Sequence, residues 1–281
     1  MHYPIAMIPY ANMAPYLEMG PPPECYFVNC LPRNSIAALQ SGAVWAAAVP
    51  VGGLPILKEV VEPIGLFGIG ARGGVMSVLF FSDRPFDGFA APLTVRLTGE
   101  SASSVRLLYL LMGWQHGFDR VAPLAASGAV ANGQLVIGDT ALKWCYQFEQ
   151  QGMVKGYGHV ADLATLWEQR WQLPFVFARW VVRLDAPEVI KRRLREWLDG
   201  FANQEAALIE RAVPKVATRL ALPDDYARRY LKIIRRCLTA DDQAGQDQFL
   251  QGWEHHGAGR STVWFTTQGK EIGNGTHPHN P

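Results

Sequence analysis

The strand that most clearly indicates the fold lies in the sequence RGGVMSVLFFSDRP, residues 72–85. Its apolar run at residues 75–81 is bounded by a pair of glycines on one side and by Asp83-Arg84-Pro85 on the other. An apolar run of this length between Gly and Pro breakers predicts a buried β-strand. The elements that surround this strand in the chain decide the fold class.

On the N-terminal side of this strand, the pattern predicts two further strands with a helix between them. Residues 5–8 and 46–49 are short apolar runs, each typical of a buried strand. The helix is expected to begin at Asn34 or Ser35, because either side chain can cap the apolar-periodic run that follows. Gly42 is expected to end this helix.

On the C-terminal side, strands and helices continue to alternate. Residues 93–97 predict a strand that leads into a helix over residues 105–112. Residues 135–137 predict another strand, followed by a helix over residues 140–151. Short apolar runs that alternate with longer amphipathic stretches are typical of an α/β protein.

The order of elements predicts two lobes and a tail. The chain is charge-rich and almost entirely helical in pattern from residue 187 to residue 256. We therefore expect a first lobe made of residues 1–92 and 179–257, and a second lobe made of residues 93–178. Residues 258–281 are rich in Gly, Thr and His, and we expect an extended or disordered tail there.

Composition excludes several classes of protein. The chain has 281 residues, of which 49% are hydrophobic and 18% are charged, so a collagen, a coiled coil and a disordered protein are excluded. Its 26 Lys and Arg residues against 25 Asp and Glu residues leave a formal net charge of +1. Without a basic excess to neutralise phosphates, we expect no nucleic-acid partner.

The N-terminus and the cysteines indicate a compartment. Residues 1–10 lack a positively charged region, and Pro4, Pro9 and Pro15 interrupt the chain before any apolar run becomes long enough to export or anchor it. The 4 cysteines show no Cys-x-x-Cys spacing, so we expect reduced cysteines. We therefore predict a soluble cytoplasmic protein that does not bind membranes.

Histidines occur in pairs at residues 255–256 and at residues 277 and 279. Adjacent histidines point to different faces, and no acidic residue stands at a ligand-like spacing from either pair. The sequence therefore predicts no metal site.

A cluster of serines marks a strand-to-helix turn near residue 100. The sequence Gly99-Glu100-Ser101-Ala102-Ser103 lacks the last glycine of a nucleophile elbow, which argues against a serine hydrolase. The hydroxyls of Ser101, Ser103 and Ser104 would stand at a helix N-terminus, where the dipole favours an anion. A plain helix cap explains the same residues equally well at this point.

Six segments, in this order along the chain, resemble the chorismate dehydratase family of the futalosine route to menaquinone. They are YANMAP at 10–15, GGVMSV at 73–78, SASS at 101–104, IGDTAL at 137–142, LPFVFARW at 173–180 and YLKIIRRCLT at 230–239. The similarity extends over roughly residues 5–257. No single segment is decisive, but six in register indicate the family.

The resemblance implies a fold, a reaction and two catalytic residues. The fold is a type II periplasmic-binding-protein-like fold, in which two α/β lobes are joined by two crossover strands with an interlobe cleft. The implied reaction converts chorismate to 3-[(1-carboxyvinyl)oxy]benzoate and water in menaquinone biosynthesis, with no metal or organic cofactor. The resemblance also implies that Asn12 and Ser77 line the catalytic centre, and that the substrate's own carboxylate is the base.

The same segments suggest the residues that hold the substrate. We expect Tyr10, Gly138 and Asp139, together with the serines at 101, 103 and 104, to bind chorismate. These assignments depend on the matching motifs and on the anion-binding interpretation of the serine cluster.

One departure from the family pattern keeps a second hypothesis open. The chain has Gly42-Ala43-Val44-Trp45 where the family usually has an Asp after its Gly-x-Val. If Trp45 enters the cleft, the ligand could differ, and the protein could be a non-catalytic cytoplasmic binding protein for a small aromatic or carboxylate ligand. The oligomeric state is not predicted by the sequence.

Overall fold

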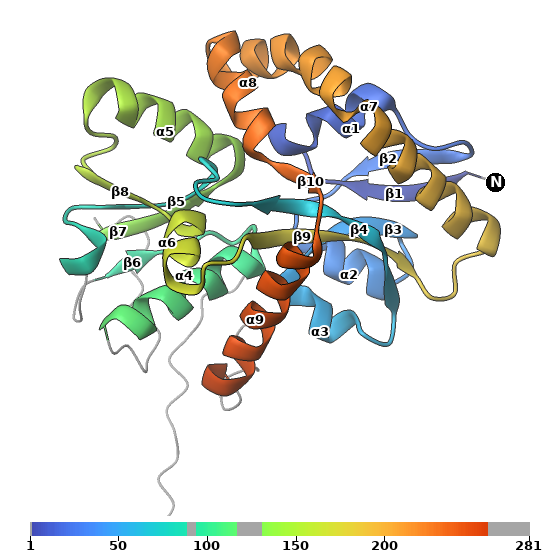
Figure 1. Ribbon diagram of the computed structural model, residues 1–281, viewed down its shortest axis with the longest axis horizontal. Helices are drawn as coiled ribbons and strands as arrows, with labels where there is room; N and C mark the ends of the chain where they lie inside the picture. Colours follow the sequence, from blue (N-terminus) through green and yellow to red (C-terminus); the bar gives the residue numbers. More distant parts are fainter. Residues whose placement is uncertain (1, 89–93, 117–130, 258–281) are drawn as a thin grey trace, which may run out of the picture.

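The computed structural model describes residues 2–88, 94–116 and 131–257. The described chain forms two β-sheets with helices packed around them (Figure 1). The first sheet is six-stranded, in the order β10-β4-β9-β3-β1-β2. Its strands are β1 (Tyr3–Met7), β2 (Cys25–Asn29), β3 (Ala46–Pro50), β4 (Val61–Ala71), β9 (Phe175–Arg183) and β10 (Arg235–Cys237).

The second sheet is four-stranded, in the order β6-β7-β5-β8. Its strands are β5 (Val78–Ser82), β6 (Val95–Arg96), β7 (Gly133–Ile137) and β8 (His159–Asp162). Phe80 of β5 packs into the main core, while its neighbour Phe81 packs on the opposite face against a smaller cluster. Because both faces of β5 are covered, its sequence is continuously apolar rather than alternating.

The strand predicted at residues 75–81 is confirmed, but it begins later and belongs to the second sheet. Residues 75–77 precede β5 and form part of a turn, in which Met76 has a φ of +59°. The chain crosses from β4 in the first sheet to β5 in the second and returns with β9. The chain therefore passes from the first sheet to the second between β4 and β5, before residue 93, where we expected the second lobe to begin. The apolar run at residues 75–81 indicates burial, but it does not indicate which strands pair with it.

The helices cover both sheets, as Figure 1 shows. They are α1 (Ala14–Met19), α2 (Asn34–Gln40), α3 (Leu54–Leu57), α4 (Ala102–His116), α5 (Gly138–Gln151), α6 (Leu163–Trp171), α7 (Glu188–Leu220), α8 (Asp224–Ile233) and α9 (Ala240–Gly257). The long helix α7 packs on α1 and α8 beside the first sheet. Short 3-10 helices occur at η1 (Ala11–Met13), η2 (Val51–Gly53) and η3 (Phe86–Gly88).

The cap predicted for the helix at residues 34–40 is wrong. Helix α2 begins at Asn34, and no side chain caps its first turn. The hydroxyl of Ser35 instead donates to the carbonyl oxygen of Pro32 at 2.6 Å. Ser35 is buried inside the first turn, so its hydroxyl bonds to the preceding loop rather than to a free helix N–H.

An aromatic cluster fixes α1 and α7 on the first sheet. The ring of Tyr16 stacks on Phe201 with centroids 3.9 Å apart and meets Trp180 of β9 edge-on at 5.5 Å. Trp180 in turn meets Trp197 of α7 edge-on at 5.4 Å. Aromatic pairs of this kind stabilise a fold by about 0.5–1.5 kcal/mol each, in addition to the effect of burying their apolar surface. The first sheet and the helices packed on it, which we call the first half of the molecule, therefore have a rigid core; the second sheet and its helices are the second half.

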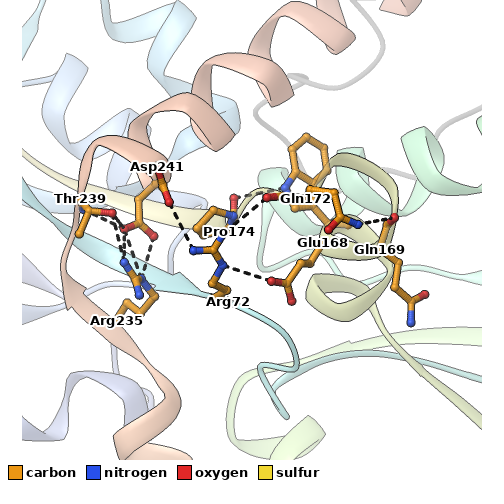
Figure 2. Close-up of polar contacts among 10 residues, drawn as sticks. Arg72, Glu168, Gln169, Gln172, Pro174, Arg235, Thr239 and Asp241 are labelled. Atoms are coloured by element: carbon orange, nitrogen blue, oxygen red, sulfur yellow. Dashed lines mark hydrogen bonds and ion pairs between the residues drawn. The ribbon is translucent and has the colours of Figure 1, made fainter.

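A network of ion pairs lies where the chain passes between the sheets, and Figure 2 shows it. Arg72, just after β4, contacts Glu168 of α6 through Nε at 3.2 Å and Asp241 of α9 through Nη1 at 3.3 Å. Its Nη2 also donates to the carbonyl oxygen of Gln172 at 3.5 Å. We call these residues, Arg72, Glu168, Gln172 and Asp241, the Arg72 clasp.

Two further properties of the chain follow from the structure. All four cysteines are free, as predicted. In the described ranges, no helix combines the length and the apolar character that a membrane span requires. The tail predicted at residues 258–281 lies outside the described residues.

Candidate functional site

A cavity lies between the two sheets, and elements of both sheets form its walls. It occupies about 510 Å3, including the part that opens to solvent. Its apolar walls include side chains from four strands and from the segments next to β1 and β5, namely Pro50, Ile69, Ile137 and Phe177 from the strands and Ile8 and Val75 from the adjoining segments.

The polar side chains of the described lining are all uncharged. They are Tyr10, Asn12, Ser77, Ser101 and Ser104. These residues come from segments that are remote in the sequence, and all of them were predicted as site residues. No Asp, Glu, Lys, Arg or His is among the residues that the structure places along this cavity. An anionic ligand would therefore be held by neutral hydrogen-bond donors rather than by ion pairs.

Asn12 lies in the middle of η1 and lines the cavity. Its Oδ1 atom is buried and has no hydrogen-bond partner. The main chain around it is fixed, since the Met13 N–H donates to the Tyr10 carbonyl oxygen at 3.0 Å. A buried unpaired polar atom costs free energy, and among the buried unpaired side-chain atoms of the described residues this one belongs to a residue that lines the cavity.

Ser77 is 4% exposed and lies immediately before β5, next to the N-terminus of α5. Its carbonyl oxygen accepts the Gly138 N–H at 2.8 Å. The turn before it is held by Asp162, whose Oδ2 accepts the N–H groups of Val75 and Met76, each at 2.8 Å. Burial raises the pKa of the Asp162 carboxyl, while the backbone N–H groups bonded to it act in the opposite direction.

Two of the three predicted serines face the cavity. The Oγ of Ser101 accepts the N–H of Ser104 at 3.2 Å and lies 3.0 Å from the Oγ of Ser104. Ser101 therefore caps α4 and lines the cavity at the same time, so the cap and the binding site are compatible. Ser103 points away from the cavity, because its Oγ donates to the Phe177 carbonyl oxygen at 3.2 Å and accepts the Gly52 N–H at 3.0 Å.

Tyr10 forms one wall of the cavity and contacts the second half of the molecule. Its hydroxyl donates to the carboxylate of Glu100. Burial and this hydrogen bond raise the pKa of Tyr10 above its ordinary value, so the phenol stays protonated.

Gly138 and Asp139 begin α5 and have different roles. Gly138 has a φ of +62°, and a Cβ at this position would lie 2.9 Å from the Cζ of Tyr10. Glycine is therefore required for the backbone conformation and for the close approach of the tyrosine ring. Asp139 does not line the cavity; its Oδ1 accepts the Ala11 N–H at 2.7 Å and its Oδ2 pairs with Arg219 Nη1 at 2.7 Å.

Trp45 does not belong to the cavity. It stands just before β3, at the opposite end of that strand from the cavity-lining residue Pro50. Its ring meets Tyr3 edge-on at 6.0 Å, and the Arg183 guanidinium lies 5.9 Å from the ring centroid. The departure from the family pattern at Trp45 therefore changes packing at a sheet end rather than the ligand cavity.

The sequence pattern did not identify the apolar walls or the partners that hold the polar residues. Ile8 and Pro50 stand at the carboxyl ends of β1 and β3, the edge at which ligands bind in open α/β sheets, so strand position could have indicated them. Glu100, the partner of Tyr10, gave no signal beyond its place in the serine segment.

No group of three or more His, Cys, Asp or Glu residues is arranged to hold a metal ion in the part of the chain that the structure describes. The histidine side chains at 255–256, and residues 277 and 279, lie outside the described part.

Comparison with solved structures defines the class of protein. A protein from Archaeoglobus fulgidus matches with a TM-score of 0.67 and 16% identity, covering 92% of this chain and 98% of that one. The alkanesulfonate-binding protein of Xanthomonas axonopodis, solved with bound MOPS, matches with a TM-score of 0.61 and 12% identity, covering 91% and 93%. The fold and the cavity between two sheets therefore define a periplasmic-binding-protein-like α/β protein, as predicted.

Sequence comparison gives the family. A family model described as menaquinone biosynthesis matches residues 3–255. The curated chorismate dehydratase of Thermus thermophilus is 30% identical over 266 residues, which cover 89% of this chain and 94% of that protein. The chain belongs to this menaquinone biosynthesis family, and the family resemblance predicted from the six segments is confirmed.

Proposed function

We propose that this protein is a chorismate dehydratase, a hydro-lyase that converts chorismate to 3-[(1-carboxyvinyl)oxy]benzoate and water in menaquinone biosynthesis. The observation that carries the proposal is that Asn12 and Ser77 line one uncharged cavity, with the Oδ1 of Asn12 buried and unpaired. The Thermus relative supports the choice of reaction. The proposal includes a cytoplasmic location, which the family resemblance implies.

Binding of the substrate depends on local hydrogen bonds. Chorismate carries two carboxylates, and the formal net charge of +1 gives the protein little long-range attraction for them. The hydroxyls of Ser101 and Ser104 stand at the N-terminus of α4, where the helix dipole favours negative charge. We assign one substrate carboxylate to this serine pair.

The reaction is a redox-neutral elimination that forms an aromatic ring. The ring C–H bond breaks, its electron pair enters the ring, and the neighbouring C–O bond breaks so that the hydroxyl leaves as water. The enolpyruvyl carboxylate of the substrate takes the ring proton and returns it to the departing hydroxyl, which leaves as water, so no protein base is needed. Because aromatisation favours the product, the barrier is mainly one of geometry and proton transfer.

Asn12 and Ser77 supply that geometry. The side-chain NH2 of Asn12 donates to the carboxylate that accepts the proton, or the Asn12 Oδ1 accepts a hydrogen bond from the hydroxyl that leaves. The hydroxyl of Ser77 donates a hydrogen bond to the departing oxygen and stabilises the charge that develops there. Preorganised neutral donors of this kind act strongly in a cavity with apolar walls, because water does not compete for them.

The experiment that tests the proposal is incubation of the purified protein with chorismate. The expected result is loss of chorismate with formation of the benzoate product, detected by chromatography and by the aromatic signals in proton NMR. The Asn12→Ala variant and heat-denatured protein serve as controls. Saturable binding of chorismate without conversion would favour the alternative, a non-catalytic binding protein, which the likeness to a sulfonate-binding protein supports.

A further inference from the structure

Two side chains hold the main chain on either side of Asn12. We call residues 10–13 the Asn12 loop. The carboxylate of Asp139 accepts the Ala11 N–H at 2.7 Å, one residue before Asn12. The Nε of Arg236 donates to the carbonyl oxygen of Asn12 itself at 3.0 Å. The position of the unpaired Asn12 Oδ1 therefore depends on both contacts.

Arg236 provides a rigid anchor on the side of the first sheet. It lies in β10 and is fully buried. Its Nη1 donates to the carbonyl oxygens of Leu231 at 3.0 Å and Ile234 at 3.2 Å, and it pairs with Glu205 Oε1 at 3.2 Å. With so many fixed partners, this guanidinium holds the Asn12 carbonyl in one place.

Asp139 provides the anchor on the side of the second sheet. It lies in the first turn of α5, directly after β7, where the helix dipole favours a carboxylate. One oxygen binds the Ala11 N–H and the other binds Arg219 at 2.7 Å, so both are occupied. A carboxylate facing a dicarboxylate substrate would repel it, whereas Asp139 stands behind the loop and outside the cavity lining.

The two anchors come from different sheets, β10 from the first and the β7–α5 connection from the second. The Asn12 loop therefore bridges the two halves of the molecule. Tyr10 adds a third contact between the loop and the second half of the molecule. Its hydroxyl donates to Glu100, and its ring packs closely against Gly138. The Asn12 side chain therefore takes its reactive position only when the second half of the molecule is in contact with the Asn12 loop.

We propose that Asp139, braced by Arg219, is a positioning residue that sets the Asn12 loop by accepting the Ala11 N–H. The inference rests on the proposed function and replaces the expectation that Asp139 binds the substrate. The role requires an oxygen at residue 139 that accepts the Ala11 N–H, and it depends less on the negative charge of the carboxylate. A displacement of a reacting group by about 1 Å can cost about 10²-fold in rate.

The test compares Asp139→Ala with Asp139→Asn in the full chain. Asp139→Ala removes the acceptor and should lower kcat about 10²-fold with little change in KM, because the loop no longer places Asn12. Asp139→Asn keeps an oxygen that can accept the Ala11 N–H, and its kcat should stay within about tenfold of the wild-type value. The matched control is Asp185→Ala. This change removes a carboxylate that lies 2.7 Å from the Arg183 guanidinium and does not line the cavity, so kcat should be unchanged.

Hydrogen exchange of the Ala11 amide, measured without substrate, separates the positioning role from a general loss of structure. Exchange at this amide should be faster in Asp139→Ala and close to wild type in Asp139→Asn. The thermal midpoint should fall in Asp139→Ala, because the buried Ala11 N–H loses its acceptor, but exchange of amides elsewhere should stay close to wild type. Full kcat in Asp139→Ala, equal losses in both variants, or a rise in KM alone would each overturn the inference. If the wild-type protein does not convert chorismate, the proposed function fails instead, and exchange at Ala11 still reports whether Asp139 holds the loop.

Discussion

The cavity and the Arg72 clasp both connect the two halves of the molecule, but they use opposite kinds of interaction. The polar side chains of the described cavity lining are neutral and largely buried. The clasp consists of ion pairs whose side chains are 46%, 31% and 61% exposed for Arg72, Glu168 and Asp241 (Figure 2). Buried hydrogen bonds are costly to lose, whereas exposed ion pairs contribute about 0–1 kcal/mol and are screened by salt. We therefore expect activity to depend on the cavity and to depend little on the clasp.

The largest effect is expected from the two proposed catalytic residues. Asn12→Ala and Ser77→Ala should each lower kcat about 10²-fold or more and change KM much less, because their hydrogen bonds strengthen in the transition state. Both variants should keep the wild-type thermal midpoint, since neither change opens a large apolar cavity. Steady-state kinetics with chorismate checks this, and full activity in Asn12→Ala would contradict the mechanism.

The next effect separates the serines that face the cavity from the one that does not. A Ser101→Ala, Ser104→Ala double variant should weaken chorismate binding by about 1–3 kcal/mol, because it leaves a buried carboxylate without donors. Ser103→Ala should leave binding unchanged and lower stability by about 1–3 kcal/mol, because the buried Gly52 N–H loses its acceptor.

Calorimetric titration in an Asn12→Ala background measures the affinity while turnover is slow, and chemical denaturation measures the stability. Unchanged affinity in the double variant would mean that Ser101 and Ser104 only cap α4.

A smaller effect is expected at the clasp. Arg72→Ala should lower the free energy of unfolding by less than about 1 kcal/mol at low salt. The difference from wild type should disappear near 1 M salt, where the Debye length is about 3 Å. Denaturant unfolding at two salt concentrations checks this prediction. A loss of kcat as large as that of Asn12→Ala would show that the clasp controls the cavity.

The smallest effect concerns pH. The pKa of Tyr10 is raised above its ordinary value by burial and by Glu100, so this phenol stays protonated at neutral pH. Its contribution to stability is complete below a pH of about 10, the ordinary tyrosine pKa, and is lost as pH rises through the folded-state pKa. We therefore expect kcat to be flat from about pH 6 to 8.5, because the substrate carboxylates stay ionised throughout. A steep dependence traced to a protein histidine would contradict substrate-assisted proton transfer.

Several strands could be predicted from the sequence, and β4 shows why one of the others was missed. The expected strands at residues 5–8, 46–49 and 135–137 correspond to β1, β3 and β7. Strand β4 was missed because its sequence VEPIGLFGIGA contains proline and glycines that are typical of loops. In the structure, a Cβ at Gly68 would collide with the Ala178 carbonyl oxygen of β9, so this glycine permits close strand approach rather than a turn.

Strand β10 shows how tertiary contacts override a local pattern. It lies inside the stretch from residue 187 to residue 256 that was predicted to be almost entirely helical. Arg235 and Cys237 pair with β4, and Arg236 reaches the Asn12 loop from between them. These partners are remote in the sequence, so no local periodicity could indicate the strand.

The sequence by itself determined the α/β alternation, the absence of a basic excess, and, through six segments in register, the family and the motifs that contain Asn12 and Ser77. Only the tertiary structure decided that Asn12, Ser77, Ser101 and Ser104 line one cavity while Ser103, Asp139 and Trp45 do not. The reason is physical: the local sequence sets backbone conformation and the periodicity of burial. The direction of a side chain across a cleft depends on how strands remote in the sequence pair, and on which main-chain groups their side chains reach.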